Sequence, residues 1–339
     1  MSNERTILQE RLLSIVRRFP QRKLVVVGDA IADRFLYGSI ARVSREAPVF
    51  ILRHEQTQTI PGGAGNCAVN LAALGAHVSL IAAAGDDEAG RELRNKLESA
   101  HVDSEGLITS SELKTTTKVR ILAGQVHSTR QQVIRIDYED APLSDGNVRR
   151  SLNSALDKAA SDADAVIISD YNYGVVDESV LETLRQVAGK RRIPILVDSR
   201  FRLASLNGFT SATPNEDEVE YLLGEKIENA SQLEKASEEL RQKLDYKALL
   251  VTRGSQGMML LEGGVAPLHI KAVGAESPVD VTGAGDTVIA TFALALSCDS
   301  SFSDAARLAN YAGGLVVMKR GTASITSAEL EHSIINSET

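Results

Sequence analysis

The feature of this sequence that most constrains its fold is a repeated alternation of short apolar segments with longer amphipathic ones. Segments 24–28 (LVVVG) and 166–169 are short, rich in β-branched residues and almost wholly apolar, which is typical of strands buried on both faces of a parallel sheet. Helical patterns such as 88–100 and 177–188 alternate with short segments of this kind. We therefore predict a doubly wound, mostly parallel α/β sheet with helices on both faces.

Residues 115–137 depart from this rhythm. They are rich in Thr, Val, Ile and Arg, with a rough two-residue alternation at their end, which predicts antiparallel hairpin strands. The extended run 49–53 is expected to join them in a small separate sheet. We expect the following organisation: a helical extension over 1–22, one large domain over 23–330 with inserted strands from about 35–60 and 115–137, and a tail over 331–339.

Charge and composition argue against several classes of protein. The chain has 37 Lys and Arg against 45 Asp and Glu, a formal net charge of −8, and 4% aromatic residues with no Trp. This balance disfavours nucleic-acid binding, which uses basic surfaces and aromatic stacking platforms. The apolar runs are shorter than the ~18 residues of a membrane span, and the six histidines lack zinc-site spacing. We expect a cytoplasmic protein without nucleic-acid or membrane partners.

Polar residues follow four of the predicted strands. Asp29 comes directly after the first strand, Asp170 and Asp198 end two later ones, and Thr252 with Gly254 ends a fourth. The carboxyl ends of parallel strands meet at one edge of the sheet, where ligands bind. Each of these residues also suits an ordinary turn, so the predicted site depends on their common position along the sheet edge.

The segment 280–287 (DVTGAGDT), just before an apolar helical pattern, carries the clearest chemical signal. Gly283 and Gly285 allow a tight turn whose backbone N–H groups, with the following helix N-terminus, attract an anion. Asp286 would lie beside a bound phosphoryl group and accept the proton of an attacking hydroxyl. The alternative is a glycine-rich helix start with Asp286 in the first turn.

A second glycine-rich segment, 61–66 (PGGAGN), also precedes a predicted helix. Gly62 and Gly63 admit a ligand close to the backbone, and Asn66 offers both a donor and an acceptor to hydroxyl groups. The alternative is a turn that only opens the helix.

Together these two segments resemble the signatures of the ribokinase-like (PfkB) carbohydrate kinases, and the resemblance extends over about 23–327. In that family the Gly-Ala-Gly-Asp turn forms an anion hole and its Asp is the catalytic base. The resemblance therefore implies that Gly283, Ala284 and Gly285 supply backbone donors and that Asp286 is the base. It further implies a ribokinase-like fold with a small β-sheet lid, and ATP and Mg²⁺ as cofactors, and it leaves a monovalent cation open.

The resemblance and the chemistry of the side chains imply further roles. The residues expected to bind the sugar are Asp29, Gly62, Gly63, Asn66, Asp170 and Asp198. The residues expected to bind a phosphate group of the substrate are Lys118, Arg120 and Arg200. Nucleotide binding is expected of Asn215, Thr252, Gly254, Gly257, Asp280, Thr282 and Asn310, and Mg²⁺ binding of Glu218, largely through water and ATP. The alternatives are a solvated helix start over 215–220 and solvated surface cations.

Several segments, among them 28–34 (GDAIADR) and 131–137 (QQVIRID), resemble the heptose 7-phosphate kinase branch of the family. That implies a homodimer, paired through the lid, that transfers phosphate from ATP to the C1 hydroxyl of D-glycero-D-manno-heptose 7-phosphate for ADP-heptose and lipopolysaccharide core synthesis. The chain departs from the branch at Asn172–Tyr173, where Ala-Lys is common, and at Ser199–Arg200, where Pro-Lys is common. Bifunctional members carry a nucleotidyltransferase domain after the kinase, so we expect another protein to supply any adenylyl transfer.

The acceptor stays open at this stage. The same chemistry suits another sugar, sugar phosphate or nucleoside, and a non-catalytic sugar- or nucleotide-binding protein could use the same fold. Retention of Asp286 favours an enzyme. An oxidoreductase is disfavoured, because the segment after the first strand lacks the G-x-G-x-x-G spacing of a dinucleotide site.

Overall fold

A nine-stranded sheet forms the body of the protein in the computed structural model, which describes residues 2–124, 130–140, 143–274 and 278–337. Its strands run parallel except β12, which is antiparallel to both of its neighbours, so the predicted doubly wound, mostly parallel fold is confirmed. In order across the sheet they are β13 (Leu268–Ile270), β12 (Met258–Glu262), β11 (Ala248–Thr252), β10 (Ser211–Ala212), β9 (Ile195–Ser199), β8 (Ala165–Asp170), β1 (Lys23–Gly28), β4 (His77–Gly85) and β5 (Leu107–Ser110).

Helices cover both faces of this sheet, and each face has its own core. Successive residues of β1 alternate between the cores: Leu24 and Val26 pack in one, Val25 and Val27 in the other. The first core packs against α1 (Ser2–Val16), α2 (Ala64–Ala73), α3 (Glu88–Ser99), α8 (Ala284–Ser297), α9 (Phe302–Val316) and α10 (Ser327–Asn336). The second packs against α4 (Gly146–Ala160), α5 (Glu178–Arg191), α6 (Glu216–Leu223) and α7 (Ala230–Lys243).

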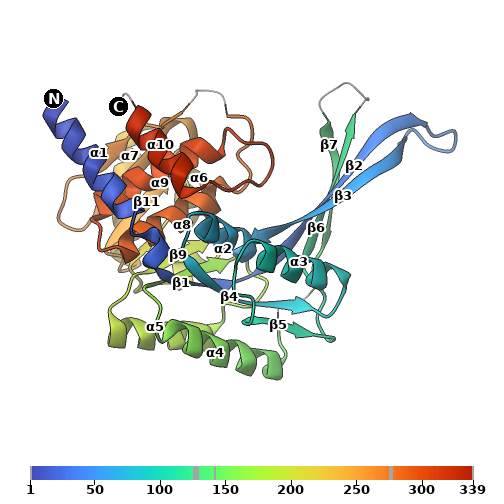
Figure 1. The fold of residues 1–339 in the computed structure, drawn as a ribbon, viewed down its shortest axis with the longest axis horizontal. Helices are drawn as coiled ribbons and strands as arrows, with labels where there is room; N and C mark the ends of the chain where they lie inside the picture. The colour runs from blue at the N-terminus through green and yellow to red at the C-terminus, as the bar shows by residue number, and fades with distance from the viewer. Residues whose placement is uncertain (1, 125–129, 141–142, 275–277, 338–339) are drawn as a thin grey trace.

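The predicted small sheet is also present and projects away from the body (Figure 1). It has the order β3-β2-β6-β7, from β2 (Ala30–Val43), β3 (Phe50–Gly63), β6 (Thr117–Gly124) and β7 (Gln131–Tyr138). The first hairpin extends further toward the body than the expected 35–60. No alternation marks its root in the sequence, because Ala30, Ile31 and Ala32 are all buried. The projecting sheet is therefore rooted directly at the carboxyl end of β1.

The helix α1 packs onto the body and does not stand apart from it. Leu12, Ile15 and Val16 are buried in the first core, and α1 lies beside α10 near the C-terminus (Figure 1). The Gln9 side-chain amide donates to the Ile334 carbonyl at 3.0 Å, and Arg11 pairs with Asp304 at 2.8 Å. Of the helices described, none has both the length and the apolar character needed to cross a bilayer.

Candidate active site

The base predicted from the sequence lies where two helices begin. Asp286 is in the first turn of α8 and is only 6% exposed. The Asn66 side-chain amide, in the first turn of α2, donates to Asp286 Oδ2 at 2.6 Å, and the Tyr171 hydroxyl donates to Oδ1 at 3.3 Å. Asn70 extends this contact, because its amide donates to Asn66 and its oxygen accepts from Thr287 at 2.8 Å. The carboxylate is thus held on both oxygens.

The environment of Asp286 suits a general base. Burial raises the pKa of Asp286 from 3.8 to about 7, although the donors Asn66 and Tyr171 lower it, and the nearby Asp33 raises it further. A base with a pKa near neutrality is half ionised at neutral pH and is strong enough to take a hydroxyl proton. The position of the carboxylate beside a glycine-rich helix N-terminus suits phosphoryl transfer in particular.

The loop after β8 carries Tyr171 and is braced by Asp29. Both Asp29 oxygens accept backbone N–H groups, at 2.9 Å from Tyr171, 3.0 Å from Tyr173 and 3.1 Å from Val175. Burial raises the pKa of Asp29, and these hydrogen bonds oppose the rise. Asp29 was predicted to bind sugar hydroxyls; in this structure its carboxylate holds the Tyr171 loop, and sugar binding remains a prediction.

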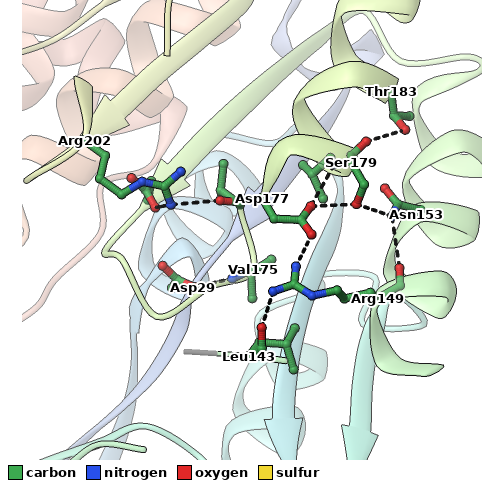
Figure 2. Close-up of polar contacts among 12 residues, drawn as sticks. Asp29, Leu143, Arg149, Asn153, Val175, Asp177, Ser179, Thr183 and Arg202 are labelled. Atoms are coloured by element: carbon green, nitrogen blue, oxygen red, sulfur yellow. Dashed lines mark hydrogen bonds and ion pairs between the residues drawn. The ribbon is translucent and has the colours of Figure 1, made fainter. Parts of the chain in front are cut away.

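The same loop is tied down further along by charged side chains (Figure 2). Arg202 donates to the Val176 carbonyl at 2.9 Å and to Asp170 at 3.5 Å. Asp177 caps α5 through Val180 N–H at 3.0 Å and pairs with Arg149, which also donates to the Leu143 carbonyl. The hydroxyl of Tyr171 therefore meets Asp286 from a rigid loop. Asp170, predicted to bind sugar, also accepts from Ser199 at 2.7 Å.

Acidic side chains from both predicted groups, the sugar-binding Asp170 and Asp198 and the magnesium-binding Glu218, influence one another's charge around Asp198. Burial raises the pKa of Asp198 well above its ordinary value, and the carboxylates of Asp286, Glu218 and Asp170 add to the rise. Asn215 and Glu218 form a capping box at the start of α6, with bonds of 2.8 and 2.9 Å, so the helix-start alternative describes their present contacts. Burial also raises the pKa of Glu218, despite the opposing charge of Arg200.

The cations predicted to bind a substrate phosphate come from two places. Lys118 on β6 is half-buried, with its ammonium 5.9 and 5.5 Å from the ring centres of Tyr171 and Tyr173. Arg120, two residues on, forms an ion pair with buried Asp33. Exposed Arg200 lies after β9, with its guanidinium 5.5 Å from the ring centre of Phe201.

The glycines of the second motif make room for the root of the projecting sheet. A Cβ at Gly62 would lie 2.4 Å from Asp33 Oδ2, and Gly63 has φ of +56° and lies against the Asp29 carbonyl. Only glycine fits both requirements without a shift of the neighbouring atoms. The segment therefore positions Asp33 as well as opening α2.

Asp33 lies in the site, but the sequence analysis assigned it no role of its own. It is 7% exposed, pairs with Arg120 and raises the pKa of Asp286. The available signal was a carboxylate directly after the apolar run 30–32, because a buried carboxylate requires a partner. Its partner is 87 residues away in sequence, so periodicity did not reveal the pair.

Four of the seven residues predicted to bind nucleotide line one cavity of about 210 Å³, whereas Asn215, Asp280 and Thr282 do not line it. Its walls are mostly apolar, from Val273, Val281, Val288 and others, and Ala284 and Gly285 at the start of α8 complete it. Thr252, Gly254, Gly257 and Asn310 all line it, and the Asn310 amide donates to the Lys271 carbonyl at 2.7 Å. An apolar cavity that ends at a helix N-terminus suits a planar base with its phosphates.

Asp280 shapes the turn that leads into α8. It accepts from the Thr282 N–H at 2.9 Å and from the Gly321 N–H at 3.0 Å. Burial alone would raise the pKa of Asp280, but these hydrogen bonds outweigh it and the pKa is lowered. Asp280 and Thr282 therefore fix the turn in this structure, and direct nucleotide contact remains a prediction.

The pH dependence of turnover tests the assignment of the base. A general base acts in its ionised form, so the prediction that Asp286 is the base implies that kcat/KM rises with pH through about 7. The Tyr171 hydroxyl lowers the pKa of Asp286, so Tyr171→Phe should move the inflection to higher pH. Both profiles use the same substrate, so its own titration cancels in the difference. An inflection that stays in place or moves to lower pH would contradict this assignment.

Comparison with known proteins agrees with this geometry. Residues 21–329 match the family described as pfkB family carbohydrate kinase. The bifunctional protein HldE of Nitrosococcus oceani is 41% identical over 319 residues, which cover 93% of this chain and 64% of that protein. HldE of Pseudomonas aeruginosa (strain UCBPP-PA14) is 39% identical over 94% of this chain and 64% of its own length.

This protein is a carbohydrate kinase and belongs to the pfkB family. Solved structures show the same fold: phosphofructokinase-2 from Escherichia coli in complex with substrates and products superposes with a TM-score of 0.75 at 20% identity, over 93% of this chain and 98% of that one. Ribokinase from Arabidopsis thaliana, complexed with ribose and ATP, gives 0.72 at 22% identity, over 93% and 99%. The chain spans slightly less than two thirds of the HldE proteins.

Proposed function

We propose that this kinase transfers the γ-phosphoryl group of ATP to the C1 hydroxyl of D-glycero-D-manno-heptose 7-phosphate in the cytoplasm. The observation that carries the proposal is the buried carboxyl of Asp286, with its pKa raised to about 7, at the N-terminus of α8 between the nucleotide cavity and the root of the projecting sheet. The choice of heptose is supported by the similarity to HldE proteins.

The reaction follows from the positions of these groups. Asp286 takes the proton of the sugar hydroxyl, whose oxygen forms a bond to the γ-phosphorus while the bond to ADP breaks. The backbone N–H groups at Gly283–Gly285 and the dipole of α8 stabilise the charge on the moving phosphoryl group. Asn66 and Tyr171 keep the carboxylate oriented toward the hydroxyl.

A magnesium ion fits beside Asp198 and Glu218. Both carboxyl groups have pKa values raised by burial, and Asp198 is raised further by neighbouring carboxylates, so a cation here would relieve an unfavourable concentration of negative charge. In the described parts of the chain no three acidic, His or Cys side chains converge to enclose a metal. Mg²⁺ would therefore keep water and ATP oxygens as its main ligands, and it would neutralise phosphate charge.

The 7-phosphate is proposed to lie near Lys118. Burial lowers the pKa of the Lys118 ammonium, since it lies over Tyr171 and Tyr173 at the root of the lid, and an incoming phosphate would stabilise its charge. Tyr173 stands where the heptose kinase branch commonly has Lys. We propose that Lys118 supplies this cation from the lid and that Arg200, after β9, supplies a second one.

The lid is also the proposed homodimer contact. Strand β7 is exposed along its length, and its exposed side chains include Val133, Ile134, Ile136 and Tyr138. An exposed apolar edge strand is suited to pairing with a second copy. A monomer in analytical ultracentrifugation at assay concentration would contradict this proposal.

Acceptor preference tests the proposed function. We expect the highest rate of ADP release with Mg·ATP and D-glycero-D-manno-heptose 7-phosphate, ahead of the unphosphorylated heptose, fructose 6-phosphate, ribose and adenosine. Lys118→Met should raise the KM for the heptose phosphate about tenfold or more, the value of a charge-assisted hydrogen bond, without changing the KM for ATP. Arg42→Met, an exposed lid cation, is the matched control. Preference for another acceptor would retain the kinase and reject the heptose.

A further inference from the structure

A second cavity lies under the N-terminal helix, on the far side of one wall of the nucleotide cavity. It has a volume of about 240 Å³ and is enclosed by α1, β13 and its following segment, and α9 (Figure 1 shows α1 and α9 in the body of the protein). Leu8 and Leu12 of α1 and Ile270 supply apolar lining. It is similar in size to the nucleotide cavity of about 210 Å³, so it has room for an organic molecule.

The charged lining of this cavity is all of one sign. Arg5, Lys271 and Arg307 line it together with His269, and no Asp or Glu does so among the residues described. This is notable in a chain with a formal net charge of −8. The Nε2 atom of His269 lies at hydrogen-bonding distance, 2.8 Å, from Glu234 Oε1. Arg307 is half-buried and forms no ion pair or hydrogen bond within the described residues, so its charge lacks a partner.

The two cavities share a wall made by Val273 and Asn310. The Asn310 amide donates to the Lys271 carbonyl at 2.7 Å, which ties α9 to the segment that carries a cavity cation. A ligand that draws Lys271 and Arg307 together would act on both elements of that wall. Any resulting change in nucleotide affinity must be reciprocal, because it is a coupling free energy.

We propose that the cavity between α1, β13 and α9 binds a small organic phosphate, separate from both substrates, and that its occupancy alters affinity at the neighbouring nucleotide cavity. The phosphate pairs with Arg307 and Lys271, and the organic part packs against the leucines of α1. The coupling depends on the proposed assignment of the nucleotide cavity, whereas binding of the phosphate does not. The site is independent of the acceptor sugar.

Calorimetric titration of the full chain with phenyl phosphate, at saturating ADP, tests the site. Phenyl phosphate combines a phosphate with a planar apolar body, and ADP keeps the nucleotide cavity filled. We expect saturable binding, tighter than that of inorganic phosphate, that weakens about tenfold or more in Arg307→Gln. Arg17→Gln, at an exposed cation directly after α1 that pairs with Glu331 at 4.0 Å, should bind as the unmodified protein does.

Equal affinities of the unmodified protein and Arg307→Gln for phenyl phosphate would overturn the site. Loss of binding in Lys118→Met would also overturn it, because that result would place the phosphate at the acceptor position. ADP affinity with and without phenyl phosphate tests the coupling, with a change of about fivefold expected in the unmodified protein and none in Arg307→Gln. An unchanged ADP affinity would overturn the coupling. Failure of ADP itself to bind would instead reject the nucleotide cavity, and hence the proposed function.

Discussion

Asp286→Asn is expected to reduce kcat by about a hundredfold to ten-thousandfold, the usual contribution of a general base, while nucleotide binding persists. Asparagine is nearly isosteric and cannot take the hydroxyl proton. Its oxygen can accept from Asn66, and its amide can donate to the Tyr171 hydroxyl, so both present contacts are retained. Measurement of kcat and of ADP affinity by calorimetry tests this, with Asp217→Asn, an exposed acid on α6, as control.

The same substitution should stabilise the protein above neutral pH. The folded-state pKa of Asp286 is raised from 3.8 to about 7, so the folded chain binds this proton more tightly than the unfolded chain does. Its favourable contribution is complete below 3.8 and is lost as pH rises through about 7, where burying the ionised group costs a few kcal/mol. In denaturant unfolding, the free energy of unfolding of Asp286→Asn relative to that of the unmodified protein should increase between pH 5 and pH 8. Near-normal turnover, or a loss of stability at pH 8, would reject Asp286 as a buried base.

Gly283→Ala and Gly285→Ala are expected to differ in their effect on stability, although both should reduce turnover. Gly283 has φ of +76°, and a Cβ there would lie 2.6 Å from the Asn66 amide nitrogen that holds Asp286. Gly283→Ala should therefore cost about 1–3 kcal/mol of stability and also reduce turnover, since the base loses its position. At Gly285 a Cβ would meet no atom within 4 Å. Gly285→Ala should fold with unchanged or higher stability, because alanine is the better helix former.

The open space at Gly285 is where the transferring phosphoryl group is proposed to lie. Gly285→Ala should therefore lose about a hundredfold in kcat through displacement of that group from the helix N-terminus, with no loss of stability. Thermal denaturation and steady-state kinetics on the two variants separate the effects. A stable Gly285→Ala enzyme with full activity would show that the phosphoryl group does not bind over this turn, whatever Gly283→Ala does.

Local signals in the sequence determined the architecture and the glycine-rich turn that opens α8. The short β-branched runs and the helical patterns between them predicted the doubly wound sheet, because burial on both faces removes polar residues from a strand. The irregular segment 115–137 predicted a separate sheet, which is present as β6 and β7 with β2 and β3. The motif DVTGAGDT placed Asp286 in the first turn of a helix, as observed in α8. Each of these signals lies within a few residues of the feature it predicts.

Only the tertiary structure decided the partners of the site residues and the charge state that follows from them. Asn66 and Asp286 are 220 residues apart in sequence, and Asp29 meets Val175 across 146 residues. No period or turn rule links positions at such separations, so the carboxylate of Asp29 was assigned to the sugar although its present bonds hold the Tyr171 loop. The elevated pKa of Asp286 likewise comes from burial by several elements together. Residue type and local spacing set what each group can do chemically, and long-range packing sets which partners and which dielectric it meets.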